Sequence, residues 1–201
     1  MSLTFTNLFR QARTGLGLLL AATVVLGLLY PLLVFGIGRL TPGRADGQIV
    51  SSASVNGGKP VGSVLIGQAF TGNQWFWPRP SAAGKDGYDP TSSGASNLGP
   101  ESSDLLKAVQ ERRATLAAAD GTAPAAVAPD ALTASGSGLD PDISPEYAQQ
   151  QVARVATARG LSEQQVQALV AQHTEGRQLG FVGEPVVNVL QLNLALQQLA
   201  S

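Results

Sequence analysis

The feature that most constrains this chain is an uncharged, mostly apolar run at residues 14–38, TGLGLLLAATVVLGLLYPLLVFGIG, bounded by Arg13 and Arg39. As an α-helix the run would be about 37 Å long at about 1.5 Å per residue, enough to cross a hydrocarbon core of about 30 Å. A cleaved signal peptide is the alternative, but its apolar core is normally about 7 to 15 residues long and precedes a small-residue cleavage site. The run therefore predicts a transmembrane helix at 14–38, after a short tail at 1–13.

Two details of this run favour a partner helix in the membrane. Pro31 removes one backbone donor, so we expect a kink beside it, with the freed carbonyl satisfied by a neighbouring helix or by a local adjustment. Small residues recur at four-residue spacing, Gly17 with Ala21 and Thr23 with Gly27, and such surfaces let another helix approach closely. Small residues are also common in membrane spans in general, so a span without such a partner stays open as the alternative.

The charges that flank the run encode its orientation weakly. Arg10, Arg13 and the amino terminus favour a cytoplasmic tail, because positive charges are enriched on the inner side of spans. Arg39, Arg44 and Lys59 follow on the other side and oppose this bias. On balance the sequence predicts a single-pass protein with its amino terminus in the cytoplasm and its soluble domain outside.

Composition excludes several classes of function. The 201 residues include 13 basic and 14 acidic side chains, so the chain lacks the basic surface that a nucleic-acid partner requires. It has no cysteine and one histidine, His173, which argues against zinc sites and histidine-driven triads. Asp140, Asp142 and Glu146 form an acidic cluster without the loop of an EF-hand, so we interpret it as a turn and a helix start. We expect no metal site.

The remaining residues, 39–201, predict one loop-rich soluble domain of α+β class. Two β-rich runs, 48–55 and 61–66, are separated by the turn residues Asn-Gly-Gly at 56–58, which favours a β-hairpin. Residues 117–129 are rich in alanine and proline and are interpreted as a surface connector.

About four helices are predicted in this domain, because capping residues and glycines mark where helices begin and end. The predicted helices are 100–119 ending at Gly121, 144–159 ending at Gly160, 162–175 with Ser162 and Gln165 as a capping box, and a helix within 184–199. The leucines of the last segment also alternate like those of a strand. We favour a helix because Asn188 and Gln191 can cap it.

Motifs for nucleotide chemistry are incomplete in this sequence. The segment GSVLIGQA at 62–69 has the two glycines of a P-loop but carries Gln68 where the lysine should be. The sequence also lacks the Asp-Lys-Thr-Gly element that holds the aspartyl-phosphate of P-type pumps. No catalytic residues are therefore predicted, and we interpret the chain as a membrane-anchored partner of other proteins.

The chain places Trp75, Phe76, Trp77 and Arg79 together in a segment that cannot form a regular helix or strand. Aromatic residues and arginine dominate binding hot spots, so these four are candidates for a partner interface. The alternative is a small satellite core beneath long loops, with Arg79 stacked on one of the rings. Residue type alone favours the satellite core slightly, because hot spots are a minority of any surface.

Several motifs resemble one family across nearly the whole chain, the C subunit of the bacterial Kdp potassium-transporting ATPase, KdpC. These are the Tyr-Pro pair of the span, GSVLIGQAFTGNQWF, RPSA, SGASNLGP, ASGSGLDPDISP, QVARVATARGL and GEPVVNVLQLNLAL. The resemblance implies an accessory subunit of the bacterial cytoplasmic membrane. Its implied partners are a channel-like subunit that carries potassium and a P-type ATPase subunit. The family is described as a catalytic chaperone that raises the ATP affinity of the hydrolysing subunit.

The side of the membrane decides what this resemblance implies for ATP. A domain outside the cell cannot touch cytoplasmic ATP and would serve as a cap or ion-gathering domain at the mouth of the channel subunit. A cytoplasmic domain could contact nucleotide through Gln68, Asn97, Gly136 or Gly138. No tightly bound cofactor is expected in either case, and ATP would be reached through the partner subunit. A free-standing secreted enzyme would need cleavage near residue 40 and a nucleophile that the sequence does not offer.

Overall fold

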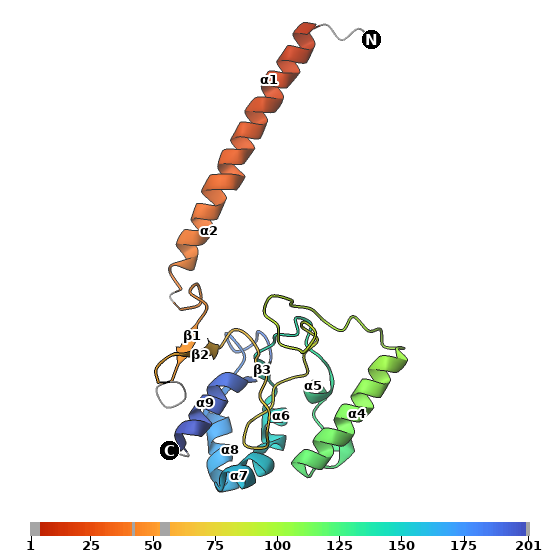
Figure 1. Cartoon of the computed structure of the whole chain (residues 1–201). Coiled ribbons are helices and arrows are strands. Elements are labelled where there is room, and N and C mark those ends of the chain that lie inside the picture. The colour runs from red at the N-terminus through yellow and green to blue at the C-terminus, as the bar shows by residue number, and fades with distance from the viewer. Residues whose placement is uncertain (1–4, 42, 53–56, 200–201) are drawn as a thin grey trace. The chain divides into compact units, whose positions relative to one another are not determined.

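A computed structural model describes residues 5–41, 43–52 and 57–199 of the chain. The chain divides into two compact units, residues 1–48 and 49–201. The first unit is helical, and the second combines helices with two small antiparallel sheets (Figure 1). The fold is thus α+β with one amino-terminal apolar helix, as predicted.

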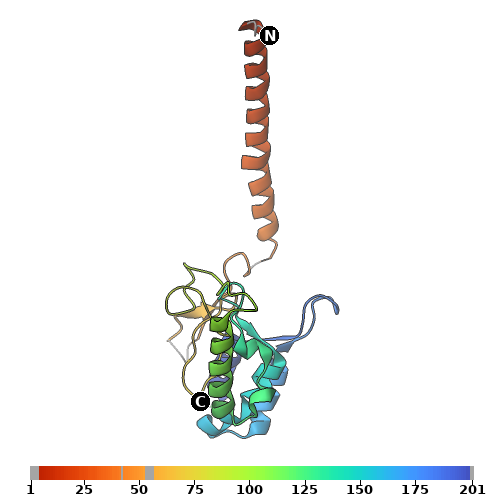
Figure 2. The same cartoon turned by 90° about the vertical axis from the view of Figure 1, so that its right-hand side faces the viewer.

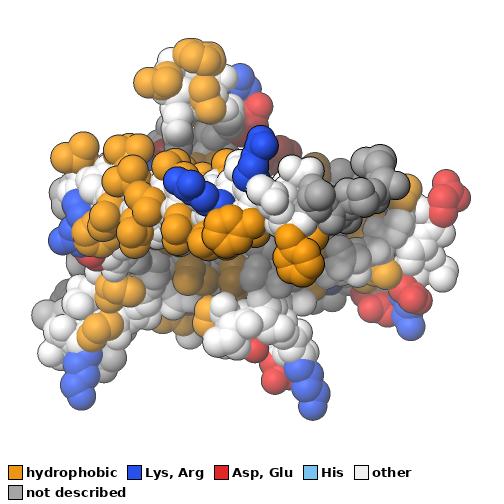
Figure 3. Space-filling model, turned by 90° about the horizontal axis from the view of Figure 1, so that it is seen from above, with side chains coloured by type: hydrophobic (Ala, Val, Ile, Leu, Met, Phe, Trp, Pro, Cys, Tyr) orange, Lys and Arg blue, Asp and Glu red, His pale blue; other side chains and the backbone are white. Residues whose placement is uncertain are grey.

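The first unit is a continuous helix from Phe5 to Gly38, long and apolar enough to cross a membrane. It consists of α1 (Phe5–Ala22), a π-helical segment η1 (Thr23–Leu29) and α2 (Tyr30–Gly38). Figure 3, a view from above, shows hydrophobic side chains gathered along this helix. The helix begins before the apolar run, so residues 5–13 of the expected tail are helical, which is consistent with the absence of proline and glycine there.

The π-helical segment accommodates Pro31. The N–H of Tyr30 bonds to the carbonyl oxygen of Val25, five residues back, where an α-helix would use the residue four back. A π-turn inserted before a proline widens the backbone where the ring would otherwise meet a carbonyl group. The helix is thus adjusted locally beside the proline, and the kink stays a prediction.

Both sheets of the second unit are small. Strands β1 (Ile49–Ser51) and β2 (Pro60–Ser63) form the predicted antiparallel hairpin, and Gly57 and Gly58 have the positive φ expected of its turn. Residues 53–56, which include Asn56, lie outside the described residues. The second sheet has the order β3-β5-β4 and was not predicted, because strands of two or three residues are too short to show alternation. Its strands are Asp142–Ile143 (β3), Thr174–Glu175 (β4) and Val186–Asn188 (β5).

The helices of the second unit begin and end close to the predicted residues. They are α4 (Ser103–Asp120), η2 (Pro124–Ala126, a 3-10 helix), α5 (Pro129–Leu132), α6 (Pro145–Gln150), α7 (Val152–Arg159), α8 (Glu163–Gln172) and α9 (Val189–Leu199). Gly121 and Gly160 adopt the left-handed conformation at the ends of α4 and α7. The capping box of Ser162 and Gln165 is formed, and Asn188 accepts a bond from the N–H of Gln191 at the start of α9. The predicted helix at 144–159 is divided at Gln151 into α6 and α7.

Segment 117–129 is exposed at residues 121 and 123–126, as expected of a surface connector, but its two ends differ from that expectation. Its first residues complete α4, and Ala117 is buried. Val127 and Ala128 are buried in the core at its other end. An alanine-rich composition is compatible with a solvated linker and with close packing, because alanine side chains are small enough to fit between helices.

The core of the second unit is one cluster to which most of its helices contribute. Tyr147 from α6, Val155 from α7, Val166 from α8 and Leu192 from α9 are almost fully buried. Phe76, from the long loop between β2 and α4, is also fully buried among them. The loop that carries the aromatic residues is therefore part of the core of the fold.

Candidate functional site

The candidate site is built around the aromatic loop, defined here as residues 70–80. Two buried side-chain amides bond to its backbone, one at each of two consecutive residues. Asn193 of α9 accepts a bond from the N–H of Phe76 and donates to its carbonyl oxygen, both at 2.9 Å. Gln151 accepts from the N–H of Trp77 at 2.7 Å and donates to its carbonyl oxygen at 3.2 Å. An irregular segment can be buried here because these amides satisfy its backbone polar groups.

Arg154 of α7 is the centre of a buried polar network beneath this loop. Its Nε donates to Asp120 at 2.7 Å, and neither side chain is more than 3% exposed. Nη1 donates to the carbonyl oxygens of Asn73 and Trp75, each at 2.9 Å, and Nη2 donates to Gln151 at 2.6 Å. An ion pair removed from water persists when further hydrogen bonds satisfy both groups, as they do here.

Two arginines stack on the tryptophans. The guanidinium of Arg154 lies 3.7 Å from the ring centre of Trp77, and that of Arg159 lies 4.4 Å from the ring centre of Trp75. Arg159 also donates to the carbonyl oxygen of Gln74 at 2.8 Å. The expectation that Arg79 stacks on a ring is wrong, since Arg79 pairs with Asp140 at 2.8 Å. The helix side chains therefore fix the orientation of both indoles.

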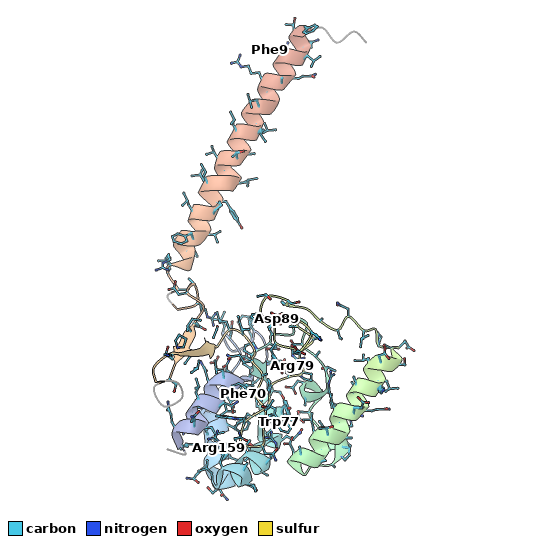
Figure 4. The ribbon with its side chains drawn as sticks, in the orientation of Figure 1. Phe9, Phe70, Trp77, Arg79, Asp89 and Arg159 are labelled. Carbon is cyan, nitrogen blue, oxygen red and sulfur yellow. The ribbon has the colours of Figure 1, made fainter. Side chains whose placement is uncertain are left out.

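The four predicted interface residues differ in how much surface they offer. Trp75, Trp77 and Arg79 are half-buried and keep part of their surface accessible. Phe76 is 0% exposed, so it belongs to the core and cannot contact a partner in this conformation. Figure 4 shows Phe70, Trp77 and Arg79 on the loop and Arg159 at the end of α7. Phe76 is thus a core residue, as the satellite-core alternative expected, but it belongs to the main core of the second unit and not to a separate small one.

A cavity of about 540 Å³ lies between the aromatic loop and α4. Phe70, Trp77 and Leu116 contribute apolar walls, and Tyr88 and Tyr147 also line it. Burial raises the pKa of Tyr88 to about 12, against a smaller lowering by nearby Arg112. Burial also raises the pKa of Tyr147. Both phenols therefore stay neutral near pH 7, and the hydroxyl of Tyr88 donates to the carbonyl oxygen of Arg79.

The four candidate nucleotide residues lie on neighbouring segments, because the N–H of Gly67, next to Gln68, bonds to Leu139, and the N–H of Gly94 bonds to Ser137. Gln68 lines a second cavity of about 370 Å³ that none of the other three lines. Asn97 is exposed with a φ of 52°, and Gly136 is exposed on a different loop. Gly138 is buried with a φ of 68°, and a Cβ there would lie 2.6 Å from the carbonyl oxygen of Gly94. The glycine at this position is explained by loop packing.

The acidic cluster is used for internal contacts. Asp140 pairs with Arg79, and Asp142 accepts a bond from Asn188 at 2.9 Å. Burial raises the pKa of Asp142, against the opposing effect of that hydrogen bond. Within residues 5–41, 43–52 and 57–199, no three His, Cys, Asp or Glu side chains come together as a metal site would need.

In the first unit, the small residues lie on two faces of the helix. Gly17 with Ala21 and Thr23 with Gly27 are exposed, and a Cβ on Gly17 would meet nothing within 4 Å. From Gly17 to Thr23 the chain turns through roughly 600° at about 100° per residue, which puts the two pairs about 120° apart. They do not form one continuous stripe.

The polar residues beneath the aromatic loop were not predicted from the sequence. Arg154 follows Gln151 by three residues and precedes Val155, so all three lie on the buried face of the α6–α7 segment. An arginine among the apolar positions of a helix is a detectable signal of a buried partner. Its acceptors, Asp120 and the loop carbonyls, lie 34 and about 80 positions away in sequence.

Together these features define a class of protein. It has a soluble domain with an internally fixed aromatic loop, and the described part of its chain has one long apolar helix that fits a single-pass membrane anchor. Comparison with known proteins narrows this class. The family model "KdpC: K+-transporting ATPase, c chain" matches residues 12–198. The chain belongs to the KdpC family, as its motifs predict.

Three relatives, each named potassium-transporting ATPase KdpC subunit, illustrate the similarity. The protein of Kineococcus radiotolerans is 74% identical over 200 residues, which cover 100% of both chains. That of Nitratidesulfovibrio vulgaris is 53% identical over 183 residues and 90% of both chains. That of Geobacter sulfurreducens is 47% identical over 193 residues, covering 94% of this chain and 98% of the relative.

Proposed function

We propose that this chain is an accessory, non-catalytic subunit of the ATP-driven potassium uptake complex and supports assembly of its channel-like and P-type ATPase subunits. Membership of the KdpC family makes it a component of the potassium-transporting ATPase, which has further subunits. The observation that carries the assembly role is the fixed aromatic loop. A surface held rigid before binding loses little conformational entropy on association, so it suits a permanent subunit contact.

The partly exposed edges of Trp75, Trp77 and Arg79 are the proposed contact surface of this loop. Trp75→Ala and Arg79→Ala should each reduce co-purification of the full chain with the other subunits while the domain stays folded. Leu106→Ala, on the exposed face of α4, is a matched surface control. Loss of the folded domain in the Trp75 or Arg79 variant, measured by circular dichroism, would mean that these side chains serve the core alone.

The catalytic-chaperone effect, a higher ATP affinity of the hydrolysing subunit, is proposed to act through the subunit contact. Gln68 lines a cavity that the other three candidates do not line, and Gly138 is explained by loop packing, which supports an action without nucleotide on this chain. The KM for ATP of the assembled pump should therefore rise with Trp75→Ala and be unchanged by Gly136→Ala. A photoreactive ATP analogue that labels this chain within the complex would contradict the proposal.

A domain outside the cell, with the amino terminus in the cytoplasm, is the proposed orientation. It leads to a second candidate function, an external cap at the channel mouth without nucleotide contact, which the packing role of Gly138 also favours. Because the chain has no cysteine, Ser103→Cys and Ser137→Cys each introduce one exposed thiol. Labelling by a membrane-impermeant reagent in intact cells supports the external domain, whereas labelling only after lysis would exclude the cap.

A further inference from the structure

The segment between β4 and β5 forms a hairpin that has no part in the aromatic loop or the network beneath it. Residues 176–185, GRQLGFVGEP, leave the second sheet and return to it, and the blue-violet ribbon before α9 projects from the rest of its unit (Figure 2). The backbone of Gln178 exchanges two hydrogen bonds of 2.9 Å with that of Val182. Leu179 and Gly180 turn the chain with φ values of 54° and 83°. The 176–185 hairpin thus has a defined turn.

The tip of the 176–185 hairpin is apolar and exposed. Leu179 is 85% exposed, Phe181 73% and Val182 45%. Leu179 and Phe181 are the most exposed large hydrophobic side chains that the structure describes in the second unit. A leucine with positive φ is uncommon, because its side chain crowds the backbone in that region. Here the turn directs the side chain of Leu179 outward, where it contributes nothing to the core.

A polar base supports this apolar tip. Arg177 and Glu184 face each other across the two arms and form an ion pair of 2.6 Å. Residues 178–183 carry no charge, so the hairpin passes from a neutral ion pair at its base to apolar side chains at its end. Protein interfaces are arranged in this way, with an apolar centre that is desolvated and a polar rim that stays wet.

We propose that the tip, Leu179 with Phe181 and Val182, is a docking element that inserts into an apolar pocket on another subunit of the potassium-transporting ATPase. The inference rests on the proposed function, because it assumes that this chain is assembled with further subunits. Inserting the tip into a pocket desolvates no charged side chain. Because the turn is already formed, Leu179 and Phe181 need no further ordering of the backbone before they bind.

A lipid surface is the alternative occupant, and the charge of the hairpin argues against it. Segments that rest in the membrane interface combine an apolar face of tryptophan, phenylalanine or leucine with a polar face rich in lysine and arginine. The tip supplies the apolar side chains, but Arg177, the one cation of the 176–185 hairpin, is neutralised by Glu184. Attraction to anionic headgroups is therefore weak, which leaves a protein pocket as the better match.

The first test is co-purification of the full chain with the other subunits of the pump. The double variant Leu179→Ala/Phe181→Ala should bind them roughly tenfold or more weakly, the loss expected for truncated hot-spot residues. Its thermal unfolding should match wild type, because neither side chain belongs to the core cluster. Leu106→Ala, 59% exposed on α4, should assemble normally. Assembly of the double variant with wild-type affinity would overturn the inference.

A second test distinguishes the two occupants. Val182→Cys introduces the chain's one thiol, which can be labelled with a bimane fluorophore in the isolated full chain and followed in nanodiscs. The emission should shift to shorter wavelength only when the other subunits are added, and doxyl-labelled lipids should not quench it. Quenching by those lipids in the chain alone would establish a membrane contact instead. An unshifted emission in the assembled pump would exclude docking.

The two proposals can fail separately. If the wild-type chain does not co-purify with the other subunits, the proposed function itself is wrong. If the wild-type chain and the double variant co-purify equally well, the accessory role stands and the docking element is excluded.

Discussion

Replacing Arg154 by methionine tests whether the aromatic loop is held by the network beneath it. Methionine keeps an unbranched apolar stem and removes the guanidinium. The variant loses the 2.7 Å ion pair with Asp120, the 2.6 Å bond to Gln151 and both bonds to loop carbonyl oxygens. It also loses the cation stacked on Trp77. The other described partner of the Asp120 carboxylate, the amide of Gln150 at 2.7 Å, remains.

The expected cost follows from the charge that is left behind. The Asp120 side chain is 0% exposed, so Arg154→Met strands a carboxylate away from water. Removing one partner of a buried ion pair costs about 3–5 kcal/mol, a large share of the about 5–15 kcal/mol that holds a typical domain folded. The double variant Asp120→Asn/Arg154→Met leaves no buried charge and should therefore be more stable than the single variant. Arg177→Met breaks an ion pair of similar length that is 46% and 75% exposed, and should cost at most about 1 kcal/mol.

Urea unfolding of the full chain in detergent, followed by tryptophan fluorescence, measures these differences. Both tryptophans lie in the aromatic loop, so the signal reports directly on the region under test. A loss below about 1 kcal/mol for Arg154→Met, no more than an exposed pair is worth, would refute the reasoning. So would a double variant as unstable as the single one, because the stranded carboxylate would then not be the cause.

Two further predictions concern backbone packing and pH. Gly138→Ala should destabilise the soluble unit by about 1–3 kcal/mol, because alanine would have to adopt a φ of 68° and its Cβ would lie 2.6 Å from the carbonyl oxygen of Gly94. Gly136→Ala is the control: its Cβ would meet nothing within 4 Å, so its free energy of unfolding in the same urea titration should equal that of wild type. An equal cost for both alanine variants would contradict this account. Burial raises the pKa of Tyr88 from its ordinary value of 10.0 to about 12. The neutral phenol therefore contributes to the stability of the folded state below about pH 10, and this contribution is lost as the pH rises toward 12. The unfolding free energy of Tyr88→Phe should fall less steeply over that interval, and a slope equal to wild type would show that the phenol does not titrate with folding.

Features of the fold that depend on neighbouring residues were predictable. Ser162 with Gln165, Gly121 and Gly160 mark helix ends through bonds that span a few residues, and all of them act as predicted. The three-stranded sheet was not predictable, because each strand is too short for a pattern and pairs with a strand that is separated from it in sequence. The interruption at Gln151 was missed for a similar reason, since this residue bonds a loop 74 positions earlier.

Of the candidate site, the sequence identified the aromatic loop but not what surrounds it. It singled out Trp75, Trp77 and Arg79 by residue type, and could not tell that Phe76 between them is buried. Trp77 follows Phe76 in the chain but keeps part of its surface exposed, because successive side chains of an extended segment point in opposite directions. Asn193 bonds both backbone groups of Phe76 and Gln151 bonds both of Trp77, and these contacts with residues far along the chain hold the segment with Phe76 inward.

The sequence by itself determined the long apolar helix, the α+β class, most helix boundaries and the family. The reason is that hydropathy, capping and ordered motifs are local properties of the chain. Only the tertiary structure decided that the aromatic loop is part of the core, that Arg154 and Asp120 hold it, and that an apolar hairpin tip stays exposed. Those outcomes depend on contacts between residues far apart in sequence, and burial and charge pairing exist only once such contacts have formed.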